Sequence, residues 1–133
     1  MTAKIFINLP VLSVNVAKDF YQKMGMINIP EFSDDNAACM MYSGEIYVML
    51  LTHNKFAEFI SKPIANTKQT ASMILSLSVE NTEMLHLLMQ KALKAGATEP
   101  RPAIDLGFMQ QSSFEDPDGH LWEVIHMDTT KLQ

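Results

Sequence analysis

The sequence is poor in the residues on which several kinds of protein site depend. It has one cysteine, four histidines and ten basic residues, and the basic residues are not clustered. Cys39, the single cysteine, cannot form an internal disulfide and is consistent with a reducing compartment. Because phosphate binding needs clustered Lys and Arg and the net charge is −5, no nucleic-acid partner is expected.

Long apolar runs are also missing. No stretch approaches the roughly 20 apolar residues that span a bilayer, and the first residues lack the basic segment and apolar core of a signal peptide. We therefore expect a cytoplasmic protein with no membrane partner. Apolar residues still make up 47% of the chain and charged ones 19%, which suits a packed core. A chain of this length forms one structural domain, or two small halves that share a core.

What the sequence does contain is an internal repeat. Leu-Pro-Val at residues 9–11 corresponds to Leu-Ser-Val at 77–79, and each closes an apolar strand before a polar helix start. Gly25 follows the first helix as Gly96 follows the second. In the second helix, apolar residues recur near helical spacing and predict one face to bury: Met84, Leu87, Leu88 and Leu93.

The repeat predicts how the chain is organised. The first half occupies residues 1–54 and the second half residues 71–133, within one structural domain. Residues 55–70 contain Pro63, Asn66 and Thr67 and are interpreted as a linker, with a short helix around residues 55–60.

The most informative stretch is Phe-Glu-Asp-Pro-Asp-Gly-His-Leu-Trp-Glu-Val-Ile at residues 114–125. Asp-Pro-Asp-Gly at 116–119 has turn chemistry and predicts a hairpin. On the strand that follows, Leu121, Glu123 and Ile125 share one face. A carboxylate among apolar neighbours is costly to bury unless a cation or hydrogen-bond donor meets it, so Glu123 is a candidate functional residue. An exposed glutamate at the rim of the sheet is the alternative.

Together these features resemble the vicinal oxygen chelate superfamily, which includes glyoxalase I, extradiol dioxygenases, fosfomycin-resistance enzymes and bleomycin-resistance proteins. The resemblance rests on a strand, a helix and three strands given twice, on the hairpin at 116–119, and on a first strand followed by a helix with Phe20-Tyr21 before Gly25. It implies an α+β fold. Two βαβββ half-domains would form paired, curled mixed sheets around a central cleft.

The resemblance also implies positions for a metal. In metal-dependent members four residues point into the cleft, and these positions fall on Phe6, Leu50, Ile74 and Glu123. Only Glu123 has a donor atom, whereas catalytic divalent ions need roughly three protein ligands. Asn8 shares a face with Phe6, yet a neutral amide is a weak ligand. We therefore expect no metal and no cofactor.

What remains is a pocket with polar and apolar walls. If Glu123 is buried, it needs donors such as Asn8 or a glutamine, or it carries a proton. Gln110 is the alternative to Gln111 in this role. Eleven methionines are a high count; they fill core gaps or adapt to varied ligands, and core packing is favoured. The predicted ligand-binding residues are Phe6, Asn8, Tyr42, Leu50, Ile74, Ser76, Gln111 and Glu123.

Two classes of function stay open. One is a small-molecule binding protein, similar to the bleomycin-resistance members, that lacks the complete metal site. The other is an enzyme, an isomerase, lyase or dioxygenase-like protein, in which Glu123 is a catalytic base or part of an altered metal site. The ligand is not identified by the sequence. The half-domain repeat also predicts a homodimer whose pockets form where halves meet.

Overall fold

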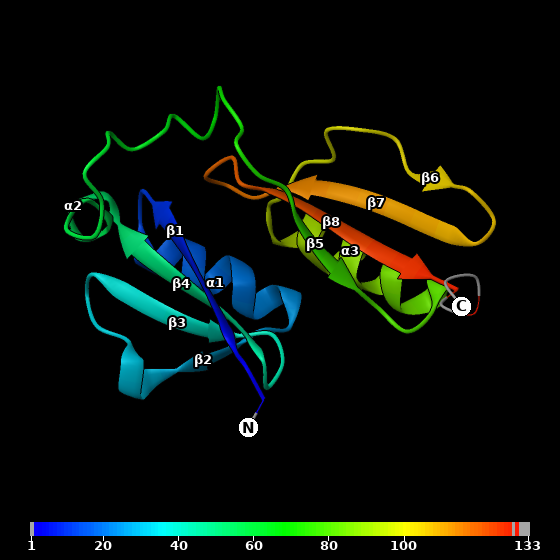
Figure 1. Ribbon diagram of the computed structural model, residues 1–133, viewed down its shortest axis with the longest axis horizontal. Helices are drawn as coiled ribbons and strands as arrows, with labels where there is room; N and C mark the ends of the chain where they lie inside the picture. The colour runs from blue at the N-terminus through cyan, green and yellow to red at the C-terminus, as the bar shows by residue number, and fades with distance from the viewer. Residues whose placement is uncertain (1, 129, 131–133) are drawn as a thin grey trace. The chain divides into compact units, whose positions relative to one another are not determined.

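The structure, a computed structural model, describes residues 2–128 and 130. The chain divides into two compact units, Met1–Asn66 and Thr67–Gln133. Each unit has one four-stranded mixed sheet and one long helix, in the order strand, helix and three strands (Figure 1). The predicted α+β fold with two βαβββ halves is therefore confirmed.

The first unit pairs its strands in the order β1-β4-β3-β2. The β1–β4 pair is parallel, and the other pairs are antiparallel. The elements are β1 (Ile5–Val11), α1 (Val14–Met24), β2 (Ile27–Ile29), the short 3₁₀ helix η1 (Pro30–Phe32), β3 (Ala37–Met41), β4 (Ile46–Thr52) and α2 (His53–Ala57).

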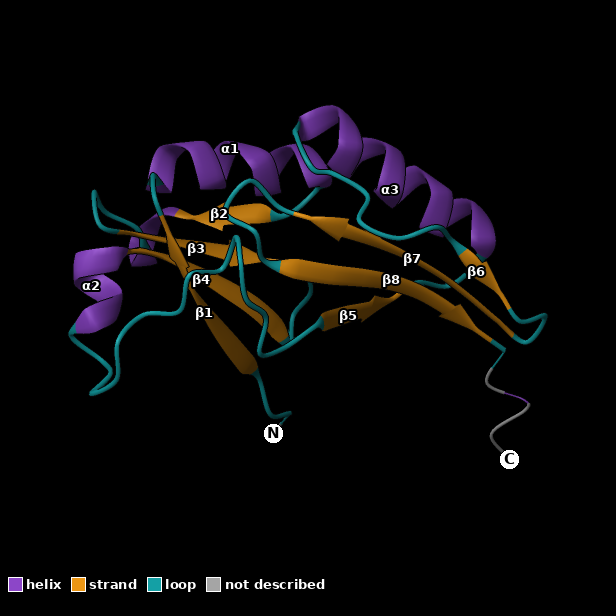
Figure 2. Ribbon diagram, turned by 90° about the horizontal axis from the view of Figure 1, so that it is seen from above, coloured by secondary structure: helices purple, strands orange, loops and turns teal. Residues whose placement is uncertain are grey.

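Helix α1 covers one face of this sheet and leaves the other open (Figure 2). It begins because the Ser13 side chain accepts a hydrogen bond from the Val16 N–H, and it ends at Gly25, whose φ is 111°. Its buried stripe has helical spacing and consists of Val14, Ala17, Phe20, Tyr21 and Met24.

A short helix, α2, follows β4. It begins at His53, two residues earlier than the sequence indicates, because the Thr52 side chain caps it by accepting from the Lys55 N–H. Lys55 also forms an ion pair with Glu58 at 3.5 Å, on the exposed side of this turn.

The second unit pairs its strands in the order β5-β8-β7-β6. Its elements are β5 (Leu75–Ser78), α3 (Thr82–Ala95), β6 (Ile104–Asp105), β7 (Met109–Glu115) and β8 (Leu121–Met127). The β5–β8 pair is parallel, as β1–β4 is in the first unit.

Helix α3 buries a different stripe from the predicted one. Leu85, Met89 and Ala92 are buried, whereas Met84 and Leu87 are 44% and 50% exposed. The predicted stripe is wrong because the face of α3 that packs on β7 and β8 carries the residues at i, i+4 and i+7 from Leu85. No helix among the described residues is long and apolar enough to cross a membrane.

Strands β7 and β8 have two unlike faces. Phe114, Trp122 and Val124 are fully buried on the face that α3 covers, and the Phe114 and Trp122 rings stack at 6.1 Å. Residues of the other face, including Gln111 and Glu123, are only half-buried. This open face is polar as well as apolar, and it carries the candidate site.

The Asp-Pro-Asp-Gly turn between β7 and β8 is held from two sides. Asp116 Oδ1 accepts from the backbone N–H groups of Asp118 and His120, at 3.0 and 2.8 Å. Thr67 Oγ1 donates to the Asp118 carbonyl at 2.6 Å. Gly119 has φ of 91°, and a Cβ there would lie 2.3 Å from the Thr67 carbonyl oxygen. Only glycine fits this close approach.

Replacing Gly119 with alanine is therefore expected to lower the free energy of unfolding by about 2 kcal/mol or more, through strain and clash. Equilibrium unfolding in urea measures it. Gly44→Ala is the matched control, because Gly44 does not have a positive φ and a Cβ there meets nothing within 4 Å. Equal losses in both variants would contradict this account of the turn.

Candidate functional site

A pocket of about 350 Å³ opens on the uncovered face of the second sheet. Its walls come from β7, β8, the residue before β5, and the segment that leads into β6. Six of the eleven lining residues are apolar, and the polar ones other than Arg101 lie on β7 and β8. The lining residues are Ile74, Pro100, Arg101, Pro102, Ile104, Gln111, Ser112, Ser113, Leu121, Trp122 and Glu123.

The carboxylate of Glu123 is oriented by two neutral donors. Ser76 Oγ donates to Glu123 Oε1 at 2.7 Å, and Gln111 Nε2 donates to Glu123 Oε2 at 2.5 Å. The parallel β5–β8 register places Ser76 directly beside Glu123, and the antiparallel register places Ser113 on its other side. Each carboxylate oxygen thus has one partner, which fixes the rotamer of the side chain.

No cation neutralises Glu123 within the described part of the chain. The ion pairs found there, Lys23–Asp19 and Lys55–Glu58, both lie in the first unit. An ionised carboxylate has about four acceptor sites, and only two are used. Glu123 can therefore accept further hydrogen bonds from a bound molecule. Of the donors expected from the sequence, a glutamine is present. The Asn8 side chain, in the first unit, donates to the Phe6 carbonyl at 3.4 Å.

The predicted site residues of the second unit come together. Ile74, 55% exposed, lines the same pocket as Gln111 and Glu123, and Ser76 is bonded to Glu123. Gln110, the alternative to Gln111, points elsewhere, since its side chain bonds to Asp105 and Gly107 at the β6–β7 turn.

Two predicted residues lie on the open face of the first sheet. Phe6 is 51% exposed and stacks on Tyr47, with ring centroids 4.8 Å apart. Asn8, two residues further along β1, is exposed on the same face. Lys4 Nζ lies 5.5 Å from the centre of the Tyr47 ring.

The prediction that Leu50 lines an open face is wrong. Leu50 is 0% exposed and pairs in register with Leu9, which is also buried, on the side that α1 covers. Because side chains alternate along a strand, its neighbour Met49 takes the open-face position and pairs in register with Asn8. Asn8 and Met49 are thus the first unit's counterparts of Ser76 and Glu123.

Tyr42 lies directly after β3 and is half-buried. Alternation places it on the side of Met40, which is fully buried, and burial raises the pKa of the Tyr42 hydroxyl. Its ring therefore belongs to the margin of the core in the first unit, and the open face carries Phe6 instead.

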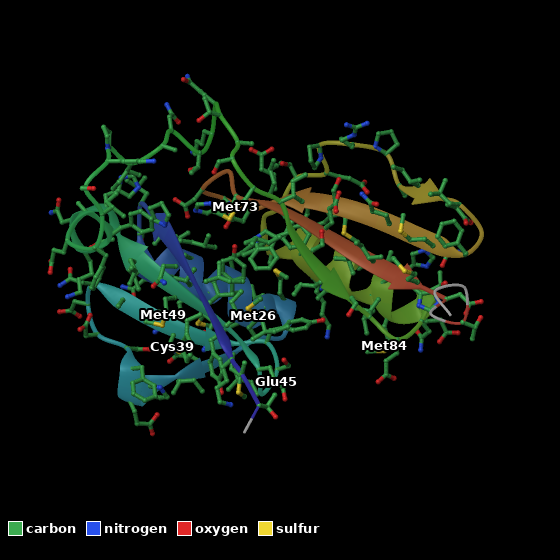
Figure 3. All side chains as sticks on the ribbon, in the orientation of Figure 1. Met26, Cys39, Glu45, Met49, Met73 and Met84 are labelled. Atoms are coloured by element: carbon green, nitrogen blue, oxygen red, sulfur yellow. The ribbon has the colours of Figure 1, made fainter. Side chains whose placement is uncertain are left out.

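The sulfur-containing side chains of the first unit serve mainly as packing. Cys39 and Met49 lie side by side on adjacent strands (Figure 3). Cys39 is 1% exposed, and burial raises the pKa of its thiol, which makes it a poor nucleophile. Met40 is fully buried, while Met41 is half-buried.

Sequence reasoning missed one wall of the pocket. Pro100, Arg101 and Pro102 lie in the segment between α3 and β6, and Ile104 is the first residue of β6; no periodic pattern in this part of the sequence marks a strand face. The available signal was the tripeptide Pro-Arg-Pro, which contains the only arginine of the sequence.

Comparison with known proteins agrees with the fold. The family model of the glyoxalase/bleomycin resistance protein/dioxygenase superfamily matches residues 6–124. The chain belongs to this superfamily. The resemblance seen in the sequence is thereby confirmed. A comparison with curated proteins found no match.

Several solved protein structures are similar to nearly the whole chain. A hypothetical protein from S. aureus has a TM-score of 0.78 at 19% identity, covering 95% of this chain and 94% of its own. A glyoxalase/bleomycin resistance protein/dioxygenase family enzyme from Burkholderia phytofirmans has a TM-score of 0.77 at 17% identity, covering 95% of this chain and 99% of its own. The fosfomycin resistance protein FosX from Listeria monocytogenes has a TM-score of 0.68 at 17% identity, covering 95% of this chain and 93% of its own. At these identities the likeness shows the fold alone.

The residues present do not fit the divalent metal that some superfamily members hold. Within the described residues no three side chains of His, Cys, Asp or Glu gather at one place. Among the residues of the second unit that the structure describes, Ser76 and Gln111 are the polar side chains that bond to Glu123, and Ile74 has no donor atom. Phe6 and Met49 on the first sheet offer no hard ligand. A carboxylate whose partners are neutral donors is set up to bind hydrogen-bond donors.

We expect purified protein to hold no stoichiometric divalent ion, because one carboxylate falls short of the roughly three ligands such ions need. Elemental analysis of protein purified without chelator measures it, with Glu123→Ala as the paired sample. About one Zn, Fe, Mn or Ni per chain that disappears in the variant would overturn this expectation.

Proposed function

We propose that this protein binds a small molecule in the pocket of its second unit, with Glu123 as the polar anchor and without a metal. The observation that carries the proposal is the carboxylate held by Ser76 and Gln111 on the pocket wall. Two oriented hydrogen bonds keep Glu123 in place before a ligand arrives, which lowers the entropic cost of binding.

The size and lining of the pocket support a small organic ligand. Ligand pockets are typically concave, mostly apolar and about 300–1,000 Å³ in volume, and this pocket, at about 350 Å³, lies at the small end. Ile74, Ile104 and Leu121 supply apolar surface around a few polar groups. Such a lining orients a ligand through its polar contacts and stabilises it by apolar burial.

The names of structural neighbours also support binding. Proteins described as glyoxalase/bleomycin resistance protein share the fold, as does FosX, which is described as a fosfomycin resistance protein. For this chain, binding in the manner of the bleomycin-resistance type needs only the pocket and its anchor. It needs no complete metal site.

An enzyme is the second candidate, favoured by the unused acceptor sites of Glu123 at a pocket wall. In that case Glu123 is a general base, or one ligand of an altered metal site, in an isomerase, lyase or dioxygenase-like reaction. No histidine, cysteine or lysine is among the residues that line the pocket. A proton taken up by Glu123 would therefore have no nearby side chain of these types to pass to, and we favour binding.

We propose further that the protein is a cytoplasmic homodimer. Cys39 as a buried free thiol suits a reducing compartment. Strand β1 is at the edge of its sheet, with Ile5 and Phe6 54% and 51% exposed. A second copy of the chain is the proposed cover for these side chains, since twofold pairing is the commonest way in which soluble proteins cover such surfaces.

Glu123→Gln is expected to leave folding largely intact but to weaken ligand binding, because an amide replaces one acceptor oxygen with a donor. Glu123→Ala is expected to lower thermal stability as well, by about 1 kcal/mol, because Ser76 and Gln111 lose their partner. Native mass spectrometry of freshly purified protein identifies any retained molecule, and melting curves with that molecule compare the variants.

Glu80→Gln is the control for this experiment, because Glu80 is exposed between β5 and α3 and does not line the pocket. The same ligand-induced rise in melting temperature in wild type, Glu123→Gln and Glu123→Ala would show that Glu123 is a rim residue. A product of altered mass after incubation would favour the enzyme.

Sedimentation equilibrium at micromolar concentration is expected to give the mass of a dimer. Phe6→Glu should shift the protein towards monomer, because a charge on an apolar contact is costly to bury. Leu12→Glu is a control, since Leu12 is 82% exposed after β1. A monomer mass for the wild type would refute the proposed assembly.

A further inference from the structure

The pocket contains a positive charge as well as the Glu123 carboxylate. Arg101 lines it, and this residue is the only arginine of the sequence. Arg101 takes part in neither of the ion pairs that occur among the described residues, Lys23–Asp19 and Lys55–Glu58. A guanidinium is always charged, and its planar donors match a carboxylate with two parallel hydrogen bonds. An acidic group on the ligand would satisfy it.

The local sequence holds Arg101 in a restricted backbone conformation. Pro100 precedes it, and Pro102 follows it. A residue before proline is confined to extended conformations, and the ring of Pro100 fixes the preceding dihedral angle. The long side chain is thus presented from a stiff segment, so less backbone entropy is lost when it binds an anion.

Glu123 requires a hydrogen-bond donor on the ligand, as Arg101 requires an acidic group. Both of its oxygens already accept from Ser76 and Gln111, and its remaining acceptor sites suit a ligand hydroxyl or ammonium. Apolar residues such as Ile104 and Leu121 line the same pocket. One pocket therefore offers a cation, an acceptor and an apolar surface.

We propose that the pocket selects a small organic acid with a hydroxyl or amino group on an apolar frame. The carboxylate pairs with Arg101, the hydroxyl or amino group donates to Glu123, and the frame contacts the apolar wall. This inference rests on the proposed function, binding in this pocket. A carboxylate fits better than a phosphate, because a phosphate carries about −1.5 to −2 charge and the pocket lining holds one cation.

Four matched compounds test the assignment. Leucic acid has the acid, the hydroxyl and a branched apolar frame; leucic amide lacks the charge; isocaproic acid lacks the hydroxyl; isocaproamide lacks both. Calorimetric titration gives each dissociation constant. The Arg101 and Glu123 variants show whether a compound enters the pocket, because both residues line it, whereas the side chain of Trp122 is fully buried on the opposite face of the sheet. We expect leucic acid to bind most tightly and isocaproamide least.

The variants separate the two polar contacts. Arg101→Gln is expected to weaken the binding of leucic acid by about tenfold or more, which is the usual contribution of a charge-assisted hydrogen bond. The dissociation constant of leucic amide should not change. Glu123→Gln should remove the advantage of leucic over isocaproic acid. Lys91→Gln is the charge-matched control, because Lys91 is exposed on α3, which packs on the opposite face of the sheet. It should change none of these constants.

Two kinds of failure are distinguishable. If acids and amides bind equally, or if Arg101→Gln weakens both alike, the acid assignment is overturned while binding at Glu123 stands. The acid assignment is also overturned if the molecule retained in native mass spectrometry depends on Glu123 but has no acidic group. If no compound binds at millimolar concentration and no retained molecule depends on Glu123, both the inference and the proposed function fail.

Discussion

The parallel pairing of β5 with β8 is the constraint on which the site depends. In this pair Ser76 is the register partner of Glu123, and a shift of one residue would turn the glutamate into the face that α3 covers. There it would take a core position of the kind that Trp122 and Val124, both fully buried, now occupy, where an unpaired charge is costly. The apolar face under α3 thus selects the register, and the register determines the polar partners of Glu123.

The turn before β8 protects the same register. Gly119 lets the chain pass close to Thr67, and the Asp116 carboxylate closes the turn through backbone N–H groups. The Asp-Pro-Asp-Gly motif therefore has a structural role in this chain, while the proposed function rests on residues that the turn positions. A glycine there reflects a close approach of two backbone segments and carries no chemistry of its own.

The pocket of this superfamily member combines groups of opposite charge. Glu123 is met by a hydroxyl and an amide instead of metal ligands, and the one arginine of the sequence lines the same pocket. Neutral donors orient a carboxylate without neutralising its charge. The pocket therefore offers a ligand both the Glu123 carboxylate and the Arg101 guanidinium. Under the proposed function, this fold supports ligand recognition without a metal.

The sequence by itself determined the repeated βαβββ order, the hairpin at residues 116–119, and the open face that holds Ser76, Gln111 and Glu123, because turn residues and period-two alternation are local properties. Tertiary structure alone decided the rest. Leu50 and Met49 are both apolar, so only pairing with β1 shows which of them α1 buries. The buried stripe of α3 depends on how the helix packs on β7 and β8. Arg101 joins the pocket through a loop without periodicity, and only the folded chain brings it to the pocket that holds Glu123.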